Sequence, residues 1–290
     1  MNDYVIVTDS CCDLSPALAD ELELRVLPLE FNLNGSEYHN YLDGRELSFG
    51  EFYKHIRNGE SCTTSAVNVE AFSSEFEAIL QSGRDVLCIA FSSGLSNTCN
   101  AAKLAAEELS PKYPDQKIYV VDSLCASLGE GLLIYLAVQA KRRGKSIDEV
   151  HQWVEKNKLH LCHWFTVEDL NHLKRGGRVS AATALIGTML SIKPVLHVDN
   201  EGHLINVGKA RGRRASLTAL VDHMVETATS PSEQTVFISH GDSQEDAEFV
   251  AGEIKKRLGV KKIFINYVGP VIGAHSGPGT IALFFLGTHR

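Results

Sequence analysis

Short apolar runs alternate with helical patterns along the first half of the chain, and each run ends in polar residues. Strands are predicted for the runs at residues 4–7, 86–91 and 118–121. A helix is expected to follow each strand. The first of these helices should be capped by Asp13 or Ser15, and the next two should lie at about residues 97–109 and 129–143. Strands that alternate with helices are typical of a parallel sheet, whose ligands gather at the carboxyl ends of the strands.

The composition changes near residue 160, where a second α/β pattern begins. Strands are predicted there at residues 162–167, 194–198, 204–207, 235–239, 262–267 and 281–286. Helices are predicted at about residues 180–190, 214–229 and 244–258. The turn Asp199–Gly202 indicates a hairpin between two of these strands. The sequence therefore predicts an α/β protein of two lobes, 1–160 with a mainly parallel sheet flanked by helices and 161–290 with a mixed sheet.

The overall charge narrows the range of partners. The chain has 290 residues and a formal net charge of -8, which argues against a nucleic-acid partner because phosphate binding needs a surplus of Lys and Arg. Its first residues show no signal-peptide pattern, and no apolar run is long enough to cross a bilayer. We expect a cytoplasmic protein without stable membrane insertion.

The cysteine content fits the same location. Seven cysteines, an odd number in a chain without a secretion signal, indicate reduced thiols. His160, Cys162 and His163 could suggest a metal site, but side chains alternate along an extended stretch, so His163 should point away from the other two. No second cluster supplies further ligands, and no metal is expected.

Three polar segments could hold an anion: Thr8–Ser10, Cys62–Ser65 and Ser92–Ser96. We interpret each as a turn at one rim of the parallel sheet, offering hydroxyls or free backbone N–H groups. For any one of them taken alone, ordinary helix capping is the better explanation. Together they predict a site for a carboxylate or a phosphate, and the choice between the two stays open.

Positive charge and a histidine occur beside glycines in the second half. Lys174–Arg178 and Lys209–Arg214 place arginines next to glycine, where a guanidinium can reach an oxyanion through two hydrogen bonds, although solvated basic turns are an alternative. Gly269–Gly279 contains four glycines, two prolines and His275. His275 could donate to a carboxylate or act as a base, unless its role is structural.

Several enzyme signatures are missing. The segment nearest to a Gly-x-Ser-x-Gly nucleophile elbow, Gly94–Thr98, lacks the second glycine. There is no P-loop and no Gly-x-Gly-x-x-Gly after a strand, so the usual nucleotide cradles are not supported. These absences favour a protein that holds its ligand over one that converts it.

The chain resembles the DegV family of bacterial fatty-acid-binding proteins in seven motifs and in the order in which they occur. They are Thr8–Ser10, Thr63–Ser65, Ser92–Ser96, Val121–Ser123, Leu173–Arg178, Lys209–Arg214 and Gly273–Gly279. The resemblance covers nearly the whole chain. It implies a long-chain fatty acid of about C16–C18 as ligand, lying between two α/β lobes, with no cofactor and no catalytic residue. It also implies a separate fatty acid kinase as partner, which makes an acyl phosphate while the acid stays bound.

The resemblance also assigns site residues. Thr64, Ser65 and Ser96 match the family's carboxylate-binding hydroxyls, with Ser93 close by, and His275 matches its histidine. The arginines of the basic segments are linked by resemblance to the carboxylate region or to the kinase; they are Arg175 and either Arg211 or Arg213. Chain length, saturation and oligomeric state are left open.

Two other functions are considered. An esterase or acyltransferase would use Ser96 or Ser93 as nucleophile and His275 as base, but no carboxylate partner for His275 is evident. A lipid-sensing regulatory protein would use the same lobes, and the sequence does not separate a sensor from a carrier.

Overall fold

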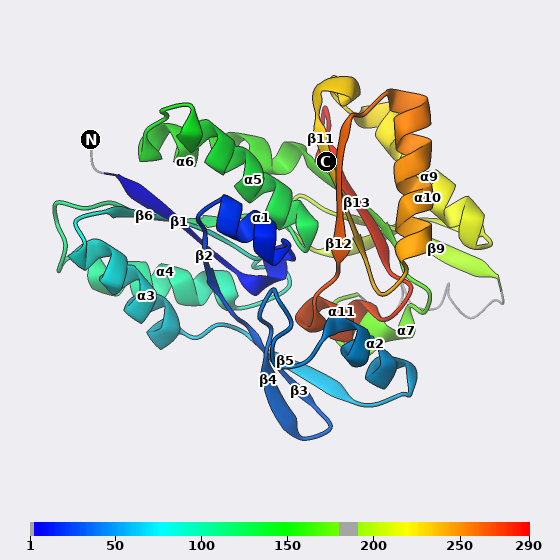
Figure 1. Ribbon diagram of the computed structural model, residues 1–290, viewed down its shortest axis with the longest axis horizontal. Helices are drawn as coiled ribbons and strands as arrows, with labels where there is room; N and C mark the ends of the chain where they lie inside the picture. Colours follow the sequence, from blue (N-terminus) through cyan, green and yellow to red (C-terminus); the bar gives the residue numbers. More distant parts are fainter. Residues whose placement is uncertain (1–2, 180–190) are drawn as a thin grey trace.

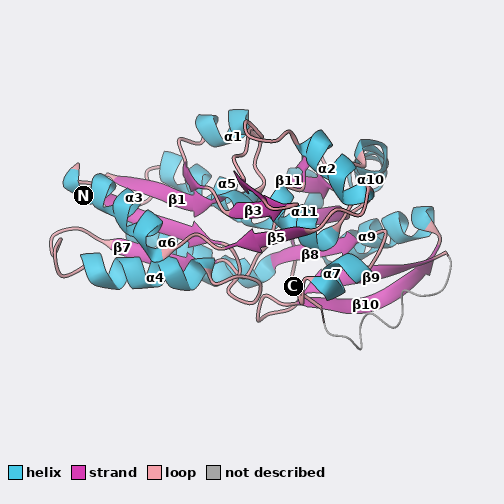
Figure 2. Cartoon of the chain, turned by 90° about the horizontal axis from the view of Figure 1, so that it is seen from below, coloured by secondary structure: helices cyan, strands magenta, loops and turns pink. Residues whose placement is uncertain are grey.

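The computed structural model describes residues 3–179 and 191–290, which form two α/β lobes side by side (Figure 1). One lobe is built on a four-stranded sheet and the other on a six-stranded sheet, and a three-stranded sheet lies where they meet (Figure 2). The predicted fold class, a parallel-sheet lobe followed by a mixed-sheet lobe, is confirmed. The predicted helix at 180–190 lies outside the described residues.

The sheet of the first lobe is parallel throughout, in the order β2-β1-β6-β7. Its strands are β1 (Tyr4–Asp9), β2 (Arg25–Leu27), β6 (Asp85–Ala90) and β7 (Ile118–Asp122). Its helices are α1 (Pro16–Glu21), α3 (Val69–Gln81), α4 (Thr98–Leu109), α5 (Leu128–Arg142) and α6 (Ile147–Asn157). Figure 1 shows α3 and α4 on one side of the sheet and α5 and α6 on the other, as expected for a buried parallel sheet.

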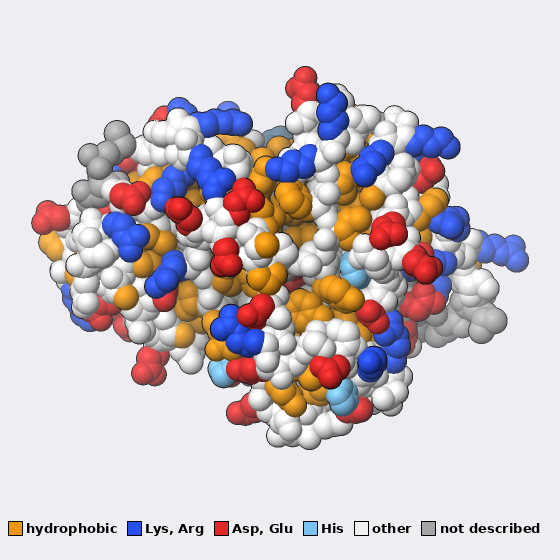
Figure 3. Space-filling model, in the orientation of Figure 1, with side chains coloured by type: hydrophobic (Ala, Val, Ile, Leu, Met, Phe, Trp, Pro, Cys, Tyr) orange, Lys and Arg blue, Asp and Glu red, His pale blue; other side chains and the backbone are white. Residues whose placement is uncertain are grey.

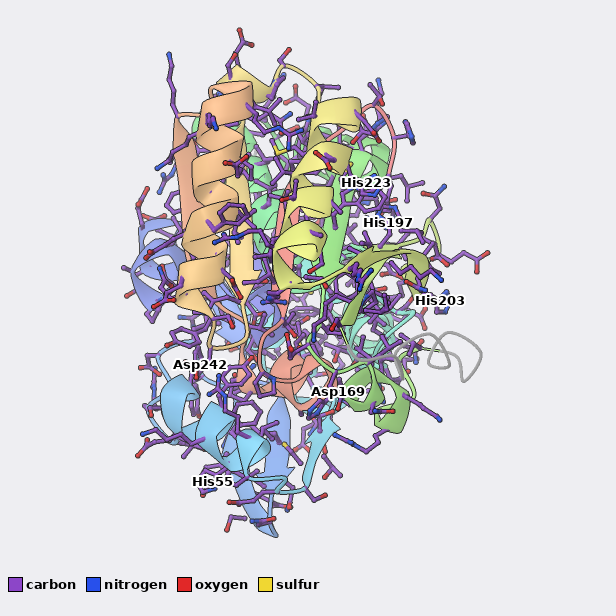
Figure 4. All side chains as sticks on the ribbon, turned by 90° about the vertical axis from the view of Figure 1, so that its right-hand side faces the viewer. His55, Asp169, His197, His203, His223 and Asp242 are labelled. Atoms are coloured by element: carbon purple, nitrogen blue, oxygen red, sulfur yellow. The ribbon has the colours of Figure 1, made fainter. Side chains whose placement is uncertain are left out.

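The second lobe has a mixed sheet in the order β10-β9-β8-β13-β11-β12, in which only β11 and β12 are parallel. Its strands are β8 (Leu161–Thr166), β9 (Ile192–Val198), β10 (Leu204–Arg211), β11 (Thr235–His240), β12 (Lys262–Tyr267) and β13 (Ile281–Leu286). The helices α9 (Arg213–Thr227) and α10 (Gln244–Leu258) cover one face (Figure 4). The other face packs against α5 of the first lobe, so one hydrophobic core runs through both lobes.

The small sheet is antiparallel, in the order β4-β3-β5. Its strands are β3 (Glu30–Leu33), β4 (Ser36–His39) and β5 (Cys62–Ser65), and α2 (Phe49–Arg57) is inserted before β5. The interpretation of Cys62–Ser65 as a turn at the rim of the parallel sheet is wrong, because this segment pairs with β3 as a strand. Its residues are all polar or small, so it carries no apolar alternation that would indicate a strand.

Two short helices complete the junction between the lobes. They are α7 (Asn171–Arg175) and α11 (Pro270–Ser276). The glycine-rich segment is therefore largely helical, with Pro270 in the first turn, where its missing N–H costs nothing. α11 contacts α2, α7, β3 and β5, so it joins the second lobe to the small sheet.

The start of the first lobe distinguishes the two expected helix caps. Ser15 caps α1 by accepting a hydrogen bond from the backbone N–H of Leu18. Asp13 instead ends a short 3-10 turn in the left-handed conformation, with φ of 51°, and its carboxyl group is buried. It is therefore available to bond residues other than those of α1.

Charged side chains of both signs are interspersed on the face of the molecule in Figure 3, with no broad basic surface on that face. Among the helices of the described residues, none has the length and apolar character needed to cross a membrane.

Candidate functional site

A cavity of about 280 Å³ lies between the two lobes. Most of its walls are apolar. The first lobe and the small sheet contribute Leu29, Ala66, Phe91, Leu95 and Ala126, and the second lobe contributes Phe165, Leu173, Val198, Leu204, Val268, Val271, Ile272, Ala282 and Phe284. Polar side chains gather at two places on this surface, one beside the small sheet and one at the start of α5. An apolar pocket with a few convergent polar groups is the usual form of a small-molecule site.

The first polar group centres on Thr64 and His275, whose Oγ1 and Nε2 atoms are 2.9 Å apart. Thr64 lies opposite Phe31 in the β5–β3 ladder, so its side chain shares the inward face with the buried Phe31 ring. His275 lies in the last turn of α11. Its ring fits against Gly176, because a Cβ there would stand 2.1 Å from the His275 Nδ1 atom. Glycine at 176 is therefore required for this close approach.

The imidazole of His275 is neutral at physiological pH. Burial, with a smaller contribution from the Arg178 charge, lowers the pKa of its imidazole to about 4. A carboxylate placed beside the ring would raise that pKa again, because a negative charge stabilises the imidazolium. An anionic ligand at this position would therefore favour protonation of His275.

Arg178 lines the cavity beside His275. Its Nε donates to the backbone oxygen of Leu95 at 3.3 Å, and its Nη1 donates to the backbone oxygen of Gly176. Within residues 3–179 and 191–290, no carboxylate forms an ion pair with this guanidinium. A guanidinium that donates to carbonyl oxygens can still bind an acidic ligand through its remaining N–H groups.

Ser65, Ser96 and Asn97 complete this polar end of the cavity. Ser96 lies in the turn between β6 and α4, where its Oγ is 2.9 Å from the Thr98 Oγ1 and accepts from the Thr98 N–H. The first turn of α4 adds the partial positive charge of a helix N-terminus. Hydroxyls, an imidazole, a guanidinium and a helix N-terminus together favour an anion such as a carboxylate.

The structure brings some predicted site residues together and leaves others apart. Thr64, Ser65, Ser96 and His275 all line the cavity. Ser93 is exposed and does not line it, and its backbone N–H donates to the Asp122 carboxylate.

The predicted arginines all lie outside the cavity. Arg175 is exposed at the end of α7, and Arg211 is exposed at the end of β10. Arg213 is held by Asp246, with 2.8 Å between Nη2 and Oδ2. The arginine that does reach the cavity, Arg178, belongs to the same predicted basic segment as Arg175, but spacing alone gave no reason to prefer it.

A wider polar groove of about 750 Å³ lies directly outside this end of the cavity. It shares Thr64, Arg178 and His275 with the cavity, and we call it the outer groove. Its other lining residues are Ile56, Arg57, Gly59, Glu60, Ser61, Cys62, Thr63, His172, Arg175, Gly176 and Ala274. A group bound at Thr64 and His275 can therefore be reached from outside through this groove.

The outer groove has an excess of positive charge. The Arg57 guanidinium forms an ion pair with Asp242, which Figure 4 places beside α2. Arg175 contacts His172 through an Nη2 to Nδ1 distance of 3.0 Å, and in the described part of the chain it forms no ion pair. Arg175 and Arg178 are therefore the cations of this groove for which the described residues supply no carboxylate partner.

The second polar group of the cavity links the two lobes at the start of α5. Ser127, at the start of α5, donates to the Asp13 Oδ2 at 2.5 Å and lies 2.9 Å from the Ser239 hydroxyl of β11. The Gly269 N–H donates to the other Asp13 oxygen at 3.0 Å. Burial raises the pKa of Asp13 to about 8, opposed by the bonds from Ser127 and Gly269. This carboxyl therefore binds residues of both lobes and tends to be protonated.

The hydroxyl contacts of His275 and Ser96 differ from those of a serine hydrolase. The hydroxyl that contacts His275 belongs to Thr64, whereas the Ser96 hydroxyl contacts Thr98. An imidazole with a pKa of about 4 is also a weak base near neutral pH, and no acidic side chain is among the groups that shift it. The geometry does not support Ser96 or Ser93 as a nucleophile activated by His275.

No metal site is found among the described residues. Cys162 packs beneath α9, whereas His163 lies on the opposite face of β8 against the first lobe, as the strand alternation predicted. His197 and His223, labelled in Figure 4, stack on Trp164 away from the cavity.

Comparisons with known proteins match this chain over nearly its whole length. A sequence model of the DegV family, described as uncharacterised proteins, matches residues 3–288. A DegV domain-containing protein of Clostridium perfringens is 48% identical over 287 residues, which are 99% of this chain and 98% of that protein.

Solved structures give the same result. A DegV family protein from Thermus thermophilus, for which fatty acid binding is described, superimposes with a TM-score of 0.88 at 30% identity, covering 99% of this chain and 100% of that one. A stearic acid-binding protein from Eubacterium ventriosum gives a TM-score of 0.86 at 25% identity, covering 97% of each chain.

Proposed function

The chain belongs to the DegV family, and on this premise we propose that it binds one long-chain fatty acid in the cavity between its lobes. The carboxylate is bound by Thr64, Ser65, Ser96 and His275, and the acyl chain lies along the apolar walls. The ligand is an acid of about C16–C18, and no cofactor takes part. The two lobes divide at residues 160 and 161, and the protein works in the cytoplasm.

The observation that carries this proposal is a cavity between the lobes with apolar walls and a cationic, hydroxyl-rich end. Burial of an acyl chain of about sixteen carbons contributes roughly 0.8 kcal/mol per methylene, on the order of ten kcal/mol in total. Burying the carboxylate without partners costs several kcal/mol. Hydrogen bonds from charged or polar donors offset that cost at about 1.5–3 kcal/mol each.

Arg178 is the cation that balances the carboxylate. It lines both the cavity and the outer groove and has no acidic partner in the described residues, whereas Arg213 is already paired with Asp246. Of the predicted arginines, Arg175 is assigned to the outer groove and to a partner. Arg211, on the far end of β10, is not assigned to the carboxylate.

The protein is a carrier that presents its ligand to a separate fatty acid kinase. The outer groove leaves the carboxylate end accessible, so a carboxylate oxygen can attack the terminal phosphorus of a nucleoside triphosphate held by the kinase. The bond from that phosphorus to the nucleoside diphosphate breaks, and an acyl phosphate remains bound. Arg175 and Arg178 favour this step because they stabilise negative charge on the phosphoryl oxygens.

Native mass spectrometry of the purified protein tests the ligand. The expected result is a retained mass of about 250–290 Da, since burial of the methylenes makes release slow. The His275→Ala variant should retain less lipid with an unchanged fold by circular dichroism. Only ligand-free protein after gentle purification from lipid-replete cells would contradict the proposal.

A second experiment tests the partner. The loaded protein is mixed with a fatty acid kinase and a nucleoside triphosphate, and the acyl phosphate is trapped with hydroxylamine as a hydroxamate. The carrier function predicts hydroxamate for wild type and much less for Arg175→Met, with equal lipid retention in both. Lipid retention without any hydroxamate would favour a lipid sensor.

A further inference from the structure

The strands β8 and β13 show how the cavity runs through the second lobe. Phe165 pairs with Ala282 and His163 pairs with Phe284, and all four residues line the cavity. Residues two apart on a strand share a face and are about 7 Å apart. The cavity therefore follows one face of this strand pair for at least two successive rungs.

The position of His275 shows which of these two rungs lies nearer to the polar end of the cavity. β13 begins at Ile281, and the preceding residue, Thr280, donates through its hydroxyl to the backbone oxygen of Ser276 at 3.1 Å. Ser276 follows His275 in α11. Moving along β13 from Ala282 to Phe284 therefore leads away from His275, and the rung of His163 and Phe284 forms the inner end of the cavity.

The ring of His163 is fixed at that end. Its Nδ1 is 3.1 Å from the backbone oxygen of Leu161, and its Nε2 accepts from the Ala126 N–H at 3.3 Å. Its side meets the Phe284 ring at right angles, with 5.3 Å between centroids. The side chain is 1% exposed. Because both ring nitrogens have partners, the ring cannot turn aside without losing a buried hydrogen bond.

Gly129 explains how the ring fits beneath α5. A Cβ at residue 129 would stand 2.2 Å from the His163 Nε2 atom and 2.8 Å from the Phe284 ring. The imidazole thus occupies space that only a glycine leaves free. Any side chain at 129 would push the ring toward the cavity, since protein interiors have little spare volume.

We infer that His163 is the stop for the acyl chain and sets the longest fatty acid that this protein accepts. This inference rests on the proposed fatty-acid binding. Affinity for straight-chain saturated acids rises by about fourfold with each methylene that is buried. It falls once the terminal methyl group reaches the imidazole, because the ring is held by two hydrogen bonds and does not adapt as a methionine would.

Competition among saturated acids from myristic to behenic, read by native mass spectrometry, tests the stop. His163→Ala removes the ring and should shift the preferred acid by roughly two to four carbons toward longer chains. Gly129→Ala should shift it toward shorter chains. His197→Ala is the matched control: its ring bonds the His163 backbone oxygen but does not line the cavity, so the preferred length should stay unchanged.

The outcomes separate this inference from the proposed function. A wild-type protein that binds none of the acids overturns fatty-acid binding itself. A folded His163→Ala variant with the wild-type length preference overturns the stop alone. If Gly129→Ala does not fold, the double variant Gly129→Ala with His163→Ala should fold, since removal of the imidazole relieves the shortest contact and leaves the Phe284 ring space into which it can shift. A double variant without the longer preference also contradicts the inference.

Discussion

Replacing Arg178 by methionine tests the assignment of the carboxylate site most directly. Methionine keeps much of the apolar stem but removes the guanidinium that lies between the cavity and the outer groove. A hydrogen bond from a charged donor contributes about 1.5–3 kcal/mol, so fatty-acid affinity should fall by about 10- to 150-fold. Loss of the bond to the Leu95 oxygen should cost about 1 kcal/mol of folding stability.

Arg175→Met is the matched control, because Arg175 lies on the same short segment and lines only the outer groove. Titration calorimetry with palmitate should give an affinity within about twofold of wild type for this variant, as expected for a solvated charge outside the cavity. A second readout is the pKa of His275 in the empty protein, measured by NMR. It should rise in Arg178→Met, since the Arg178 charge contributes to its lowering.

Equal affinities for the two variants would refute the reasoning, whichever value they took. Equal losses would mean that Arg178 acts only through the general positive charge of this surface. If both variants bound palmitate as tightly as wild type, the carboxylate would be stabilised by hydroxyls and the helix N-terminus without a cation. An unchanged pKa for His275 in Arg178→Met would contradict the stated proximity of the two groups.

Three other predictions follow from the same geometry. Thr64→Val, which keeps the shape but removes the hydroxyl bonded to His275, should weaken fatty-acid binding by about tenfold in calorimetry, and wild-type affinity would contradict its role. Fatty-acid binding should be accompanied by proton uptake, because the pKa of His275 is about 4 without a ligand and rises beside a carboxylate. The affinity for fatty acid should then increase as pH falls through the raised pKa of the complex. Calorimetry in buffers of different ionisation enthalpy measures the number of protons taken up. Folding raises the pKa of Asp13 from 3.8 to about 8. Between these pH values the unfolded state therefore binds fewer protons than the folded state, and the free energy of unfolding should decrease as pH rises from about 4 to about 8. In Asp13→Asn, the free energy of unfolding measured with urea should decrease less steeply with pH than in wild type. The same slope in the variant and in wild type would show that Asp13 is not responsible.

The elements with strong apolar periodicity could be predicted from the sequence. β1 and β6 are apolar runs buried between helices, and β7 is a partly buried apolar run at the edge of the same sheet, so all three could be located in the sequence. β5 could not be predicted, since its polar residues are stabilised by pairing with β3, a partner about thirty residues earlier that no local pattern reveals.

The sequence predicted the chemistry of the site, but it could not predict all of the residues that form it. Motif resemblance identified Thr64, Ser65, Ser96 and His275, whose side chains line one cavity, together with Ser93, which does not line it. The choice between Arg175 and Arg178 depends on α7 ending at Arg175 and on Gly176 and Gly177 turning the chain back toward the cavity. The carboxyl of Asp13 suggested a helix cap, and only the docking of α5 against β11 gives it partners in both lobes.

The shared core on both sides of α5 limits how a ligand can enter. Because α5 packs against the first sheet on one side and the second sheet on the other, swinging the lobes apart about a hinge would expose that core to water. The two halves should therefore unfold as one cooperative unit, and neither should be stable when expressed alone. Exchange of ligand must proceed through local displacement of elements around the cavity while the α5 interface stays closed.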